Sequence, residues 1–210
     1  MISVTYVTSS PYKREEIELI MQRDLASGAK INTRFTLVLE RLAIKEQLEV
    51  NIEELVRAEV KNAYAQLRIP CLVEHGGLIF EKYAGRDYPG GLTKAMWDVL
   101  GDDFVRETDS AGLSAIARSC VGYCDGKQVV TFTGETHGQI AREPRGARAF
   151  YWDTIFMPND PDGPGEGLTY AEIVDTPGLG LAYKIELSQS TKALSQLFEY
   201  RLNNSPELWP

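Results

Sequence analysis

Residues 1–13, MISVTYVTSSPYK, set the way in which the chain begins to fold. The span from Met1 to Thr8 is short, roughly alternating and rich in β-branched side chains, which predicts a strand. Ser9 and Ser10 are favourable helix N-cap residues, and Pro11 is favoured at the first helical position. We therefore expect a strand that passes directly into a helix running from about Pro11 to Asp24, as in α/β proteins.

The alternation of apolar strands and amphipathic helices continues along the chain. In the otherwise apolar stretch Cys71–Phe80, the polar pair Glu74-His75 and two glycines form an interruption that needs an explanation. The other expected elements are a strand at Ile31–Leu39, a helix at Ile52–Leu67, a helix opening at Pro89 and running through Leu100, strands at Ala115–Tyr123 and Val129–Gly134 joined by a hairpin turn at 124–127, further pairing at Gly138–Ile140, a loop at 159–167, and a last helix at Ser188–Tyr200.

Within the helix expected at Ile52–Leu67, the candidate buried positions are Leu55, Ala58, Val60, Ala63 and Leu67. No internal repeat or linker divides the chain. We expect one α/β unit with two lobes about a central groove, with residues 1–202 as the domain and residues 203–210 as a C-terminal tail.

Composition narrows the classes of function. The chain has 210 residues, of which 43% are hydrophobic and 25% charged, which is typical of an ordinary soluble domain. Its formal net charge of −8 repels polyphosphate backbones, so we expect no nucleic-acid partner. A small phosphorylated ligand stays compatible with this charge, because a few lysines in one cleft with a bound cation can reverse the local field.

The sequence also indicates the cellular compartment. No apolar run approaches the roughly 18 residues that a membrane span needs, and the N-terminus lacks a basic leader. The cysteines Cys71, Cys120 and Cys124 are odd in number and lie in apolar surroundings, which favours reduced thiols. We expect a cytoplasmic protein with no membrane partner.

Two clusters of polar residues are candidates for chemistry near phosphate or metal. The strand-to-helix turn at 8–13, followed by Glu16, offers free helix N–H groups and Lys13 to an anion, although a simple capped helix has the same pattern. Glu74-His75 suits a metal ligand or a general base, and equally a satisfied polar pair.

Two further clusters lie in the C-terminal half. The run from Glu143 to Asp153 places consecutive aromatic residues beside charged ones, which suits stacking on a planar base, while a core aromatic cluster is the plainer interpretation. The lysine-flanked polar stretch from Lys184 to Lys192 is the fourth cluster, and such a stretch is usually a solvated face.

Several common site classes are excluded by what the sequence lacks. His75 and His137 are the only histidines, and no nucleophile elbow accompanies either of them. Gly178-Leu-Gly180 lacks the rest of a dinucleotide fingerprint, and no Gly-Lys-Ser/Thr phosphate loop occurs.

Taken in their order along the chain, these clusters indicate one family of proteins. The chain resembles the inosine triphosphate pyrophosphatase (HAM-type) family, which removes pyrophosphate from non-standard purine triphosphates. The resemblance spans essentially the whole chain and rests on the segments Thr8–Glu16, Pro70–Leu78, Tyr88–Gly91, Cys120–Lys127, Phe132–Gly134, Gly138–Ile140, Pro144–Gly146, Phe150–Asp153, Ile155–Pro158, Leu168–Glu172 and Ser188–Leu194.

This resemblance implies a long central mixed sheet between two α/β lobes, a nucleotide in the groove and usually a homodimer. By position, Lys13 would grip the triphosphate, with Ser9 and Ser10 beside it, and Phe150 would stack on the purine. The remaining roles that the resemblance implies are base-pocket residues Trp152, Asp153, Ser188 and Gln189, phosphate contacts Lys184 and Lys192, and Mg²⁺ ligands Glu16, Glu49 and Glu74.

The sequence also departs from the family at its site motifs. His75 stands where the family has the aspartate that activates water, and Gly76 replaces the following Ser/Thr. Other site positions differ too, with Ser188-Gln189-Ser190 in place of a His-Arg pair after serine, Ser10 in place of the phosphate-loop asparagine, and Ala149 and Tyr151 in place of two glycines. Loss of a positioned general base costs about 10²–10⁴-fold, so we expect weak or lost hydrolysis with binding retained.

Three functions are compatible with this pattern. The first is a sensor that holds a non-standard purine nucleoside triphosphate such as ITP, dITP or XTP and signals to an effector. A protein that resembles this family acts in this way with a sirtuin-like NADase in the Kongming antiphage defence system. The second is an active pyrophosphatase in which His75 or Glu81 serves as the base, and the third is an interaction protein with a vestigial groove. Lys13 and the Phe150–Asp153 cluster argue against the third.

Overall fold

The computed structural model describes residues 1–44, 47–147 and 150–206. Its central sheet is mixed, with the strand order β2-β1-β3-β5-β6-β7 and with β4 paired to β3. The strands are β1 (Ile2–Val7), β2 (Phe35–Glu40), β3 (Cys71–Phe80), β4 (Pro89–Gly90), β5 (Ser114–Cys124), β6 (Val129–Ile140) and β7 (Phe156–Pro158). Both neighbours of β1 run parallel to it, and the other pairs are antiparallel.

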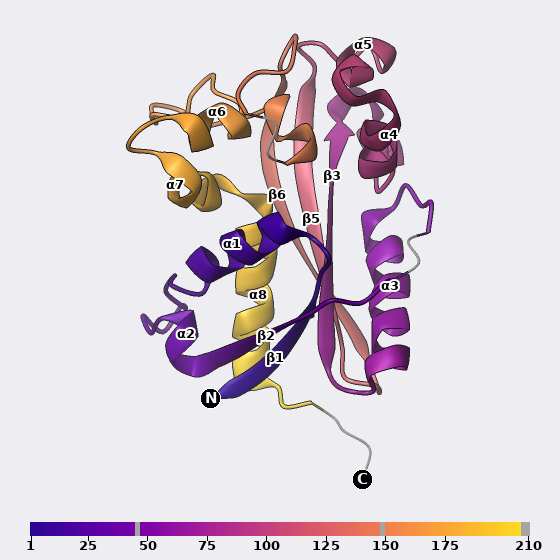
Figure 1. Ribbon diagram of the computed structural model, residues 1–210, viewed down its shortest axis with the longest axis vertical. Coiled ribbons are helices and arrows are strands. Elements are labelled where there is room, and N and C mark those ends of the chain that lie inside the picture. The colour runs from indigo at the N-terminus through magenta and orange to yellow at the C-terminus, as the bar shows by residue number, and fades with distance from the viewer. Residues whose placement is uncertain (45–46, 148–149, 207–210) are drawn as a thin grey trace.

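Helices cover both faces of this sheet (Figure 1). They are α1 (Pro11–Ile20), α2 (Ile31–Arg34), α3 (Ile52–Leu67), α4 (Thr93–Leu100), α5 (Phe104–Glu107), α6 (Tyr170–Asp175), α7 (Gly180–Leu187) and α8 (Gln189–Asn203), with short 3₁₀ turns at Glu81–Arg86, Gly101–Asp103 and Tyr151–Thr154.

Two glycines show how closely α3 and α8 approach opposite faces of the sheet. A Cβ on Gly122 of β5 would lie 2.5 Å from Val56 of α3, and one on Gly134 of β6 would lie 2.1 Å from a backbone oxygen of α8. Because strand side chains alternate between the two faces, and Gly134 lies three residues from the partner of Gly122, these contacts are on opposite faces.

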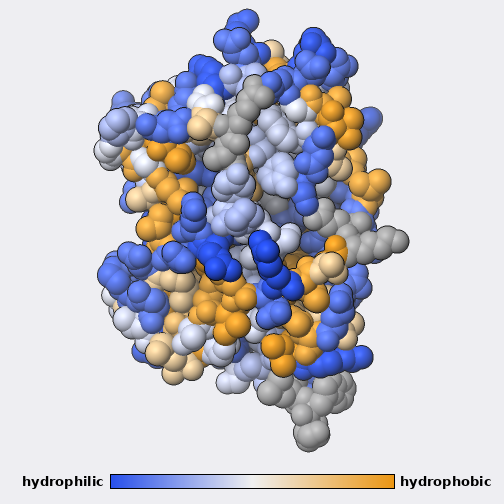
Figure 2. All heavy atoms as spheres, viewed as in Figure 1, coloured by the Kyte–Doolittle hydropathy of each residue, from blue (hydrophilic) through white to orange (hydrophobic). Residues whose placement is uncertain are grey.

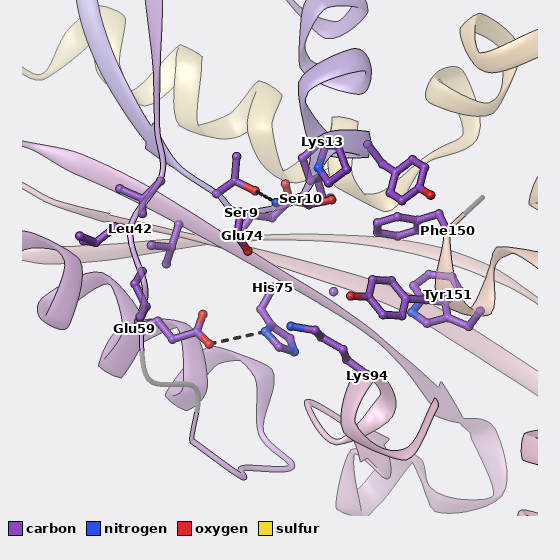
Figure 3. Close-up of a pocket in the computed structure, with 18 of the residues that line it drawn as sticks. Ser9, Ser10, Lys13, Leu42, Glu59, Glu74, His75, Lys94, Phe150 and Tyr151 are labelled. Carbon is purple, nitrogen blue, oxygen red and sulfur yellow. Dashed lines mark hydrogen bonds and ion pairs between the residues drawn. The ribbon is translucent and has the colours of Figure 1, made fainter. Parts of the chain in front are cut away.

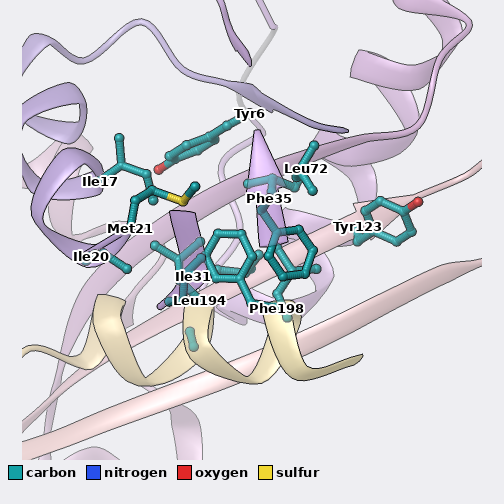
Figure 4. Packing of buried hydrophobic residues seen from close by; sticks show 14 of the residues in the cluster. Tyr6, Ile17, Ile20, Met21, Ile31, Phe35, Leu72, Tyr123, Leu194 and Phe198 are labelled. Carbon is teal, nitrogen blue, oxygen red and sulfur yellow. The ribbon is translucent and has the colours of Figure 1, made fainter. Parts of the chain in front are cut away.

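The buried apolar residues of the described chain form three clusters, of which one lies beneath α3 and two lie at opposite ends of β3 and β5. One cluster joins β1, α1 and α8 and includes Leu72 and Tyr123 (Figure 4). The other includes Leu78, Phe80 and Ala117 with residues of α5, β7 and α6. This arrangement confirms the α/β fold with two lobes on a long mixed sheet, and it leaves the Glu74-His75 segment between the lobes.

An opening in the sheet positions that segment. β1 pairs with β3 only at Thr5–Cys71 and Tyr6–Leu72, after which β1 ends and the chain turns into α1. β4 takes up pairing with β3 only from Leu78 onward. The edge of β3 at Val73–Gly76 is therefore open beside the carboxyl ends of the parallel strands, the place where α/β sheets commonly bind ligands.

Several sequence predictions of the elements are confirmed, and others are wrong. The helix at Ile52–Leu67 is confirmed residue for residue, with Asn51 capping its N-terminus, and Leu55, Val60 and Ala63 are buried, whereas Ala58 and Leu67 are only partly buried. The predicted strand Ile31–Leu39 is wrong at its start, because a helical turn held by a Thr33 hydroxyl bond to the Lys30 carbonyl precedes β2.

Other boundaries also differ. α1 ends at Ile20 rather than Asp24, because the amides of Gln22 and Arg23 turn back onto carbonyls three residues earlier. The helix expected from Pro89 begins at Thr93, since Pro89–Gly90 pairs with β3. β6 continues past Gly134 to Ile140, and the last helix continues past Tyr200 to Asn203.

The expected boundary at residue 202 stays a prediction. Residues 207–210 of the expected tail lie outside the described residues, as does Ala149. In the described part of the chain, no helix is long and apolar enough to cross a membrane.

Candidate functional site

A cavity of about 450 Å³ lies at the opening in the sheet. Its walls come from the strand-to-helix turn after β1, the middle of β3, the segment before α3 and the 3₁₀ turn at Tyr151–Thr154 (Figure 3). The lining residues are Val7, Thr8, Ser9, Ser10, Pro11, Tyr12, Lys13, Leu42, Ile44, Glu59, Val73, Glu74, His75, Gly76, Lys94, Phe150, Tyr151, Trp152 and Gln189. The face seen in Figure 1 carries strongly hydrophilic residues across its middle, between more hydrophobic areas (Figure 2).

Glu74 is the most fully bonded side chain of the cavity wall. Its Oε1 accepts hydrogen bonds from Lys13 Nζ at 2.7 Å, from Ser119 Oγ at 2.6 Å and from Ser190 Oγ, and its Oε2 accepts one from Tyr6 OH at 2.6 Å. Burial alone raises the pKa of this carboxyl, but the Lys13 ammonium and the three Oε1 hydrogen bonds outweigh burial and lower the pKa to about 2.

A second set of buried charges lies behind Lys13. Lys184 of α7 donates to Glu16 Oε1 at 2.8 Å and to Asp153 Oδ2, and all three side chains are buried. Burial lowers the pKa of Lys184, but the two carboxylates outweigh it and raise this pKa well above its usual range. Burial and the neighbouring Glu16 raise the pKa of Asp153 to about 6 against the opposing effect of Lys184.

Glu16 links this second set of buried charges to Lys13. Lys13 Nζ lies 3.6 Å from Glu16 Oε2, so Glu16 contacts both lysines. Burial raises the pKa of Glu16, but Lys184 and Lys13 outweigh it and lower this pKa below its usual value. The ionic cluster therefore joins the turn after β1 to the segment that carries the aromatic residues.

His75 lies on the other side of β3 from Glu74. Its Nδ1 is 3.7 Å from Glu59 Oε1 of α3, and the two side chains are 9% and 7% exposed. His75 Nε2 and Glu59 Oε1 have no hydrogen-bond partner in the described part of the chain. Lys94 of α4 lines the same part of the cavity (Figure 3).

The turn that leads into α1 supplies the opposite wall. Thr8 Oγ1 accepts a hydrogen bond from the Ser10 amide at 3.2 Å, and Ser10 is the N-cap residue. The Ser10 hydroxyl makes no capping hydrogen bond and is buried without a partner in the described residues. The first amides of this helix, with Lys13 one turn in, suit an anion in the cavity.

Aromatic rings close one end of the cavity. Phe150 packs edge-on against Tyr12 at 5.7 Å and against Tyr151 at 5.3 Å between ring centroids. Its ring also lies 5.8 Å from Lys13 Nζ and 5.2 Å from Lys184 Nζ. Tyr151 has a positive φ of 35°, an uncommon backbone conformation for a residue with a side chain, which marks this turn as locally strained.

The predicted site residues separate into two groups. The cavity brings together eight of them, namely Ser9, Ser10, Lys13, Glu74, His75, Phe150, Trp152 and Gln189. The others do not line it, namely Glu16, Glu49, Asp153, Lys184, Ser188 and Lys192.

Each residue of the second group has a visible partner. Glu16, Asp153 and Lys184 form the cluster behind the wall, and Ser188 caps α8 by accepting from the Ser190 amide at 3.1 Å. Glu49 accepts from the Asn51 amide at 2.9 Å, and Lys192 donates to the Glu135 carbonyl and to the Thr136 hydroxyl. Their implied contacts with nucleotide or metal stay predictions.

The three carboxylates expected to bind Mg²⁺ have other partners or lie outside the cavity. Both Glu74 oxygens are taken by hydrogen-bond donors, Glu16 contacts two lysines, and Glu49 lies outside the cavity. In the described ranges, no group of three His, Cys, Asp or Glu side chains is placed to hold a metal. These three carboxylates as arranged do not fit a metal held mainly by the protein.

Two charged residues of the cavity wall, Glu59 and Lys94, were not identified from the sequence. A signal for Glu59 was present, because it falls on the buried stripe of α3 between Leu55 and Ala63, where an isolated carboxylate is unusual. Lys94 gave no such signal, since it is a polar residue at the start of a partly exposed helix. Glu81, considered as a substitute base, does not line the cavity and lies 3.7 Å from His137 on the surface.

Fold and site together define a two-lobed α/β protein whose cavity combines a lysine, a helix N-terminus and an aromatic wall, as in proteins that bind phosphorylated nucleosides. Residues 4–200 match the Ham1 family, and the chain belongs to this family. Membership confirms the family resemblance seen in the sequence.

Curated relatives and solved structures agree with this assignment. The chain is 33% identical over 180 residues to the dITP/XTP pyrophosphatase of Methanopyrus kandleri, covering 83% of this chain and 89% of that protein. It is 31% identical over 205 residues to the inosine triphosphate pyrophosphatase of Kluyveromyces lactis, covering 95% and 96%. In fold it is similar to a HAM1 protein from Coxiella burnetii, with a TM-score of 0.67 at 21% identity over 97% of this chain and 100% of that one.

Proposed function

We propose that the chain binds a non-standard purine nucleoside triphosphate of the ITP, dITP or XTP type, with weak or lost pyrophosphatase activity, and acts as a nucleotide sensor. The observation that carries this proposal is a contrast within one cavity. Lys13, the α1 N-terminus and Phe150 are in place for a nucleotide, while His75 stands beside Glu74 where the family resemblance leads us to expect the aspartate.

The binding part follows from the chemistry of the walls. A triphosphate directed at the α1 N-terminus would meet free backbone amides and the Lys13 ammonium. A purine at the other end would stack on Phe150, between Tyr12 and Tyr151. When bound together with the nucleotide, Mg²⁺ would neutralise charge on the triphosphate oxygens.

The weak turnover follows from His75. An imidazole does not supply the anionic oxygen that would position a water molecule beside the triphosphate, and in its protonated form it cannot accept a proton from water. Glu81 does not line the cavity and lies beside His137, so we do not expect it to replace the missing base. A nucleotide that is bound and not hydrolysed is the property that a sensor requires.

The sensor would act through a partner. We propose a homodimer, or a complex with an effector such as a sirtuin-like NADase, in the cytoplasm and in antiphage defence. The test is NAD⁺ consumption by the mixture of this protein and the effector. NAD⁺ consumption that begins only when dITP is added supports the sensor role. NAD⁺ consumption at the same rate with and without dITP contradicts it.

The enzymatic part is tested by pyrophosphate release from dITP with magnesium, comparing the parent with His75→Asp. We expect release by the parent about 10²–10⁴-fold below that of an efficient pyrophosphatase, and a gain in His75→Asp. His137→Asp is the matched control, because it makes the same change at a surface histidine outside the cavity lining. Efficient release by the parent would contradict the proposal.

An active dITP/XTP pyrophosphatase is the second candidate function. The observation that favours it is the similarity to curated relatives with that name, at 33% identity over 83% of this chain. In that case the parent itself turns over dITP efficiently, and His75→Asp brings no gain.

A further inference from the structure

Tyr151 brings a hydroxyl group into the cavity. Its side chain lines the cavity wall, and its hydroxyl has no hydrogen-bond partner in the described residues. The Ser10 hydroxyl of the same wall is also without a partner there but is fully buried, whereas the Tyr151 hydroxyl keeps accessible surface. Figure 3 shows the Tyr151 oxygen directed into the cavity, towards His75. A ligand in the cavity can therefore reach this hydroxyl.

The backbone at Tyr151 indicates that this side chain has a role. Its φ of 35° is in a region that glycine adopts at little cost and that residues with a Cβ rarely adopt. Such conformations persist where the surrounding structure holds them, and they are concentrated at ligand-binding sites. Here the Tyr151 ring packs edge-on against Phe150 at 5.3 Å between centroids, and the Asp153 amide donates to the Phe150 carbonyl at 2.9 Å. The turn thus holds Tyr151 beside the ring that we expect to stack on the base.

The position of Tyr151 indicates which part of the proposed ligand it contacts. The purine would stack on Phe150, and the triphosphate would bind Lys13 and the α1 N-terminus, with Lys13 Nζ 5.8 Å from the Phe150 ring. The sugar joins the base to the phosphates, so it would occupy the part of the cavity next to Phe150, into which the Tyr151 oxygen is directed. A phenol and a sugar hydroxyl can each donate and accept a hydrogen bond, and neither partner has to change its charge.

We propose that the Tyr151 hydroxyl makes a hydrogen bond with a hydroxyl group of the nucleotide's sugar. Tyr151 is then a specificity-determining residue, which distinguishes sugars by their hydroxyl groups while Phe150 stacks on the base. The inference rests on the proposed function, since it needs a nucleoside triphosphate in this cavity.

The first test compares the parent with Tyr151→Phe by calorimetry with magnesium. The ligands are ITP, dITP, 3′-deoxy-ITP and 2′,3′-dideoxy-ITP, which differ only in their sugar hydroxyl groups. Loss of one neutral hydrogen bond predicts that Tyr151→Phe binds ITP about 2- to 10-fold more weakly. Its affinity for the dideoxy nucleotide should equal that of the parent, because this sugar has no hydroxyl to bond. The two monodeoxy nucleotides then identify the bonded hydroxyl. Tyr83→Phe is the matched control, since it makes the same change at an exposed tyrosine outside the cavity lining.

The second test determines whether the hydroxyl is structural, and it needs no ligand. Because the Tyr151 hydroxyl has no hydrogen bond in the described part of the chain, Tyr151→Phe should leave the Tm of the free protein unchanged. Tyr6→Phe is the comparison, since the Tyr6 hydroxyl donates to Glu74 at 2.6 Å and its removal should lower the Tm. A Tm lowered as much by Tyr151→Phe as by Tyr6→Phe would overturn the inference, because the Tyr151 hydroxyl would then be bonded within the protein.

The outcomes separate this inference from the proposed function. If the parent does not bind ITP, the proposed function fails and the inference fails with it. If the parent binds ITP and Tyr151→Phe binds it equally well, only the inference is overturned. It is also overturned if Tyr151→Phe weakens the binding of all four nucleotides by the same factor, because the hydroxyl would then contact the base or the phosphates.

Discussion

Glu74 and His75 are neighbours on β3 and differ in almost every respect that matters for their roles. Glu74 accepts four hydrogen bonds, and its side chain is fully buried. His75 has one long contact, to Glu59, and its buried Nε2 has no hydrogen-bond partner in the described residues. Because successive strand residues point to opposite sides, one residue faces the α1 and α8 side and the other faces α3. The comparison separates a residue that holds the two walls together from one whose buried Nε2 has no hydrogen-bond partner in the described part of the chain.

The largest expected effect is a loss of stability when the Glu74 carboxylate is removed. Glu74→Ala leaves the buried Lys13 ammonium without its closest carboxylate and leaves three hydroxyl groups without their acceptor. Removal of one partner from a buried ion pair costs about 3–5 kcal/mol. Urea denaturation should show this loss in the free energy of unfolding, and a loss below 1 kcal/mol would show that the carboxylate does not hold the walls together.

Acid should remove the stabilising contribution of the Glu74 carboxylate without any mutation. The folded pKa of Glu74 is about 2, against 4.5 for the free group, so its contribution to stability is complete above pH 4.5 and is lost as the pH falls towards 2. A difference of this size corresponds to about 3 kcal/mol. The pH dependence of the free energy of unfolding should become shallower over this range in Glu74→Gln, and an unchanged slope would contradict the assignment.

Phe150 tests the nucleotide side of the cavity. Stacking of a base on an aromatic ring contributes about 1–3 kcal/mol, so Phe150→Ala should weaken ITP binding by about 10- to 100-fold. Tyr83→Ala serves as the control, since this exposed aromatic residue lies outside the cavity lining. Equal affinity of Phe150→Ala and the parent in calorimetry would remove Phe150 from the site.

The smallest expected effect on stability is that of removing the Glu59 carboxylate. Glu59→Gln removes a carboxylate as buried as many core residues, yet its Oε1 has no hydrogen bond in the described part of the chain. We therefore expect the free energy of unfolding to change by less than about 1 kcal/mol. A loss as large as that of Glu74→Ala would show that Glu59 has a structural role comparable to that of Glu74.

The fold was predictable where local chemistry and tertiary packing agree. The strand-to-helix turn at 8–11 has Pro11 at the first helical position, and the helix Ile52–Leu67 has its own N-cap and apolar stripe. Both are found where expected. The start of Ile31–Leu39 was not predictable from its β-rich composition, because side-chain and tertiary bonds hold Ile31–Arg34 as a helical turn. α6 and α7 are short and were missed, since two turns or fewer leave little periodicity to read.

Several site residues could be identified from the sequence, but their bonding partners could not. Lys13, Glu74, His75 and Phe150 were identified from motifs, and the cavity brings them together. The sequence could not reveal that Lys184 and Asp153 bond to each other behind the wall, because the two residues are 31 positions apart. The Glu59–His75 contact likewise joins α3 to β3, two elements that pack together on one face of the sheet.

The central claim is that this chain retains a non-standard purine triphosphate instead of hydrolysing it. The most direct measurement is chromatography of the nucleotide recovered from the protein after incubation with equimolar dITP and magnesium. The account predicts that intact dITP is recovered from the protein. Recovery of dIMP and free pyrophosphate at an ordinary enzymatic rate would contradict it and would make the chain an active pyrophosphatase.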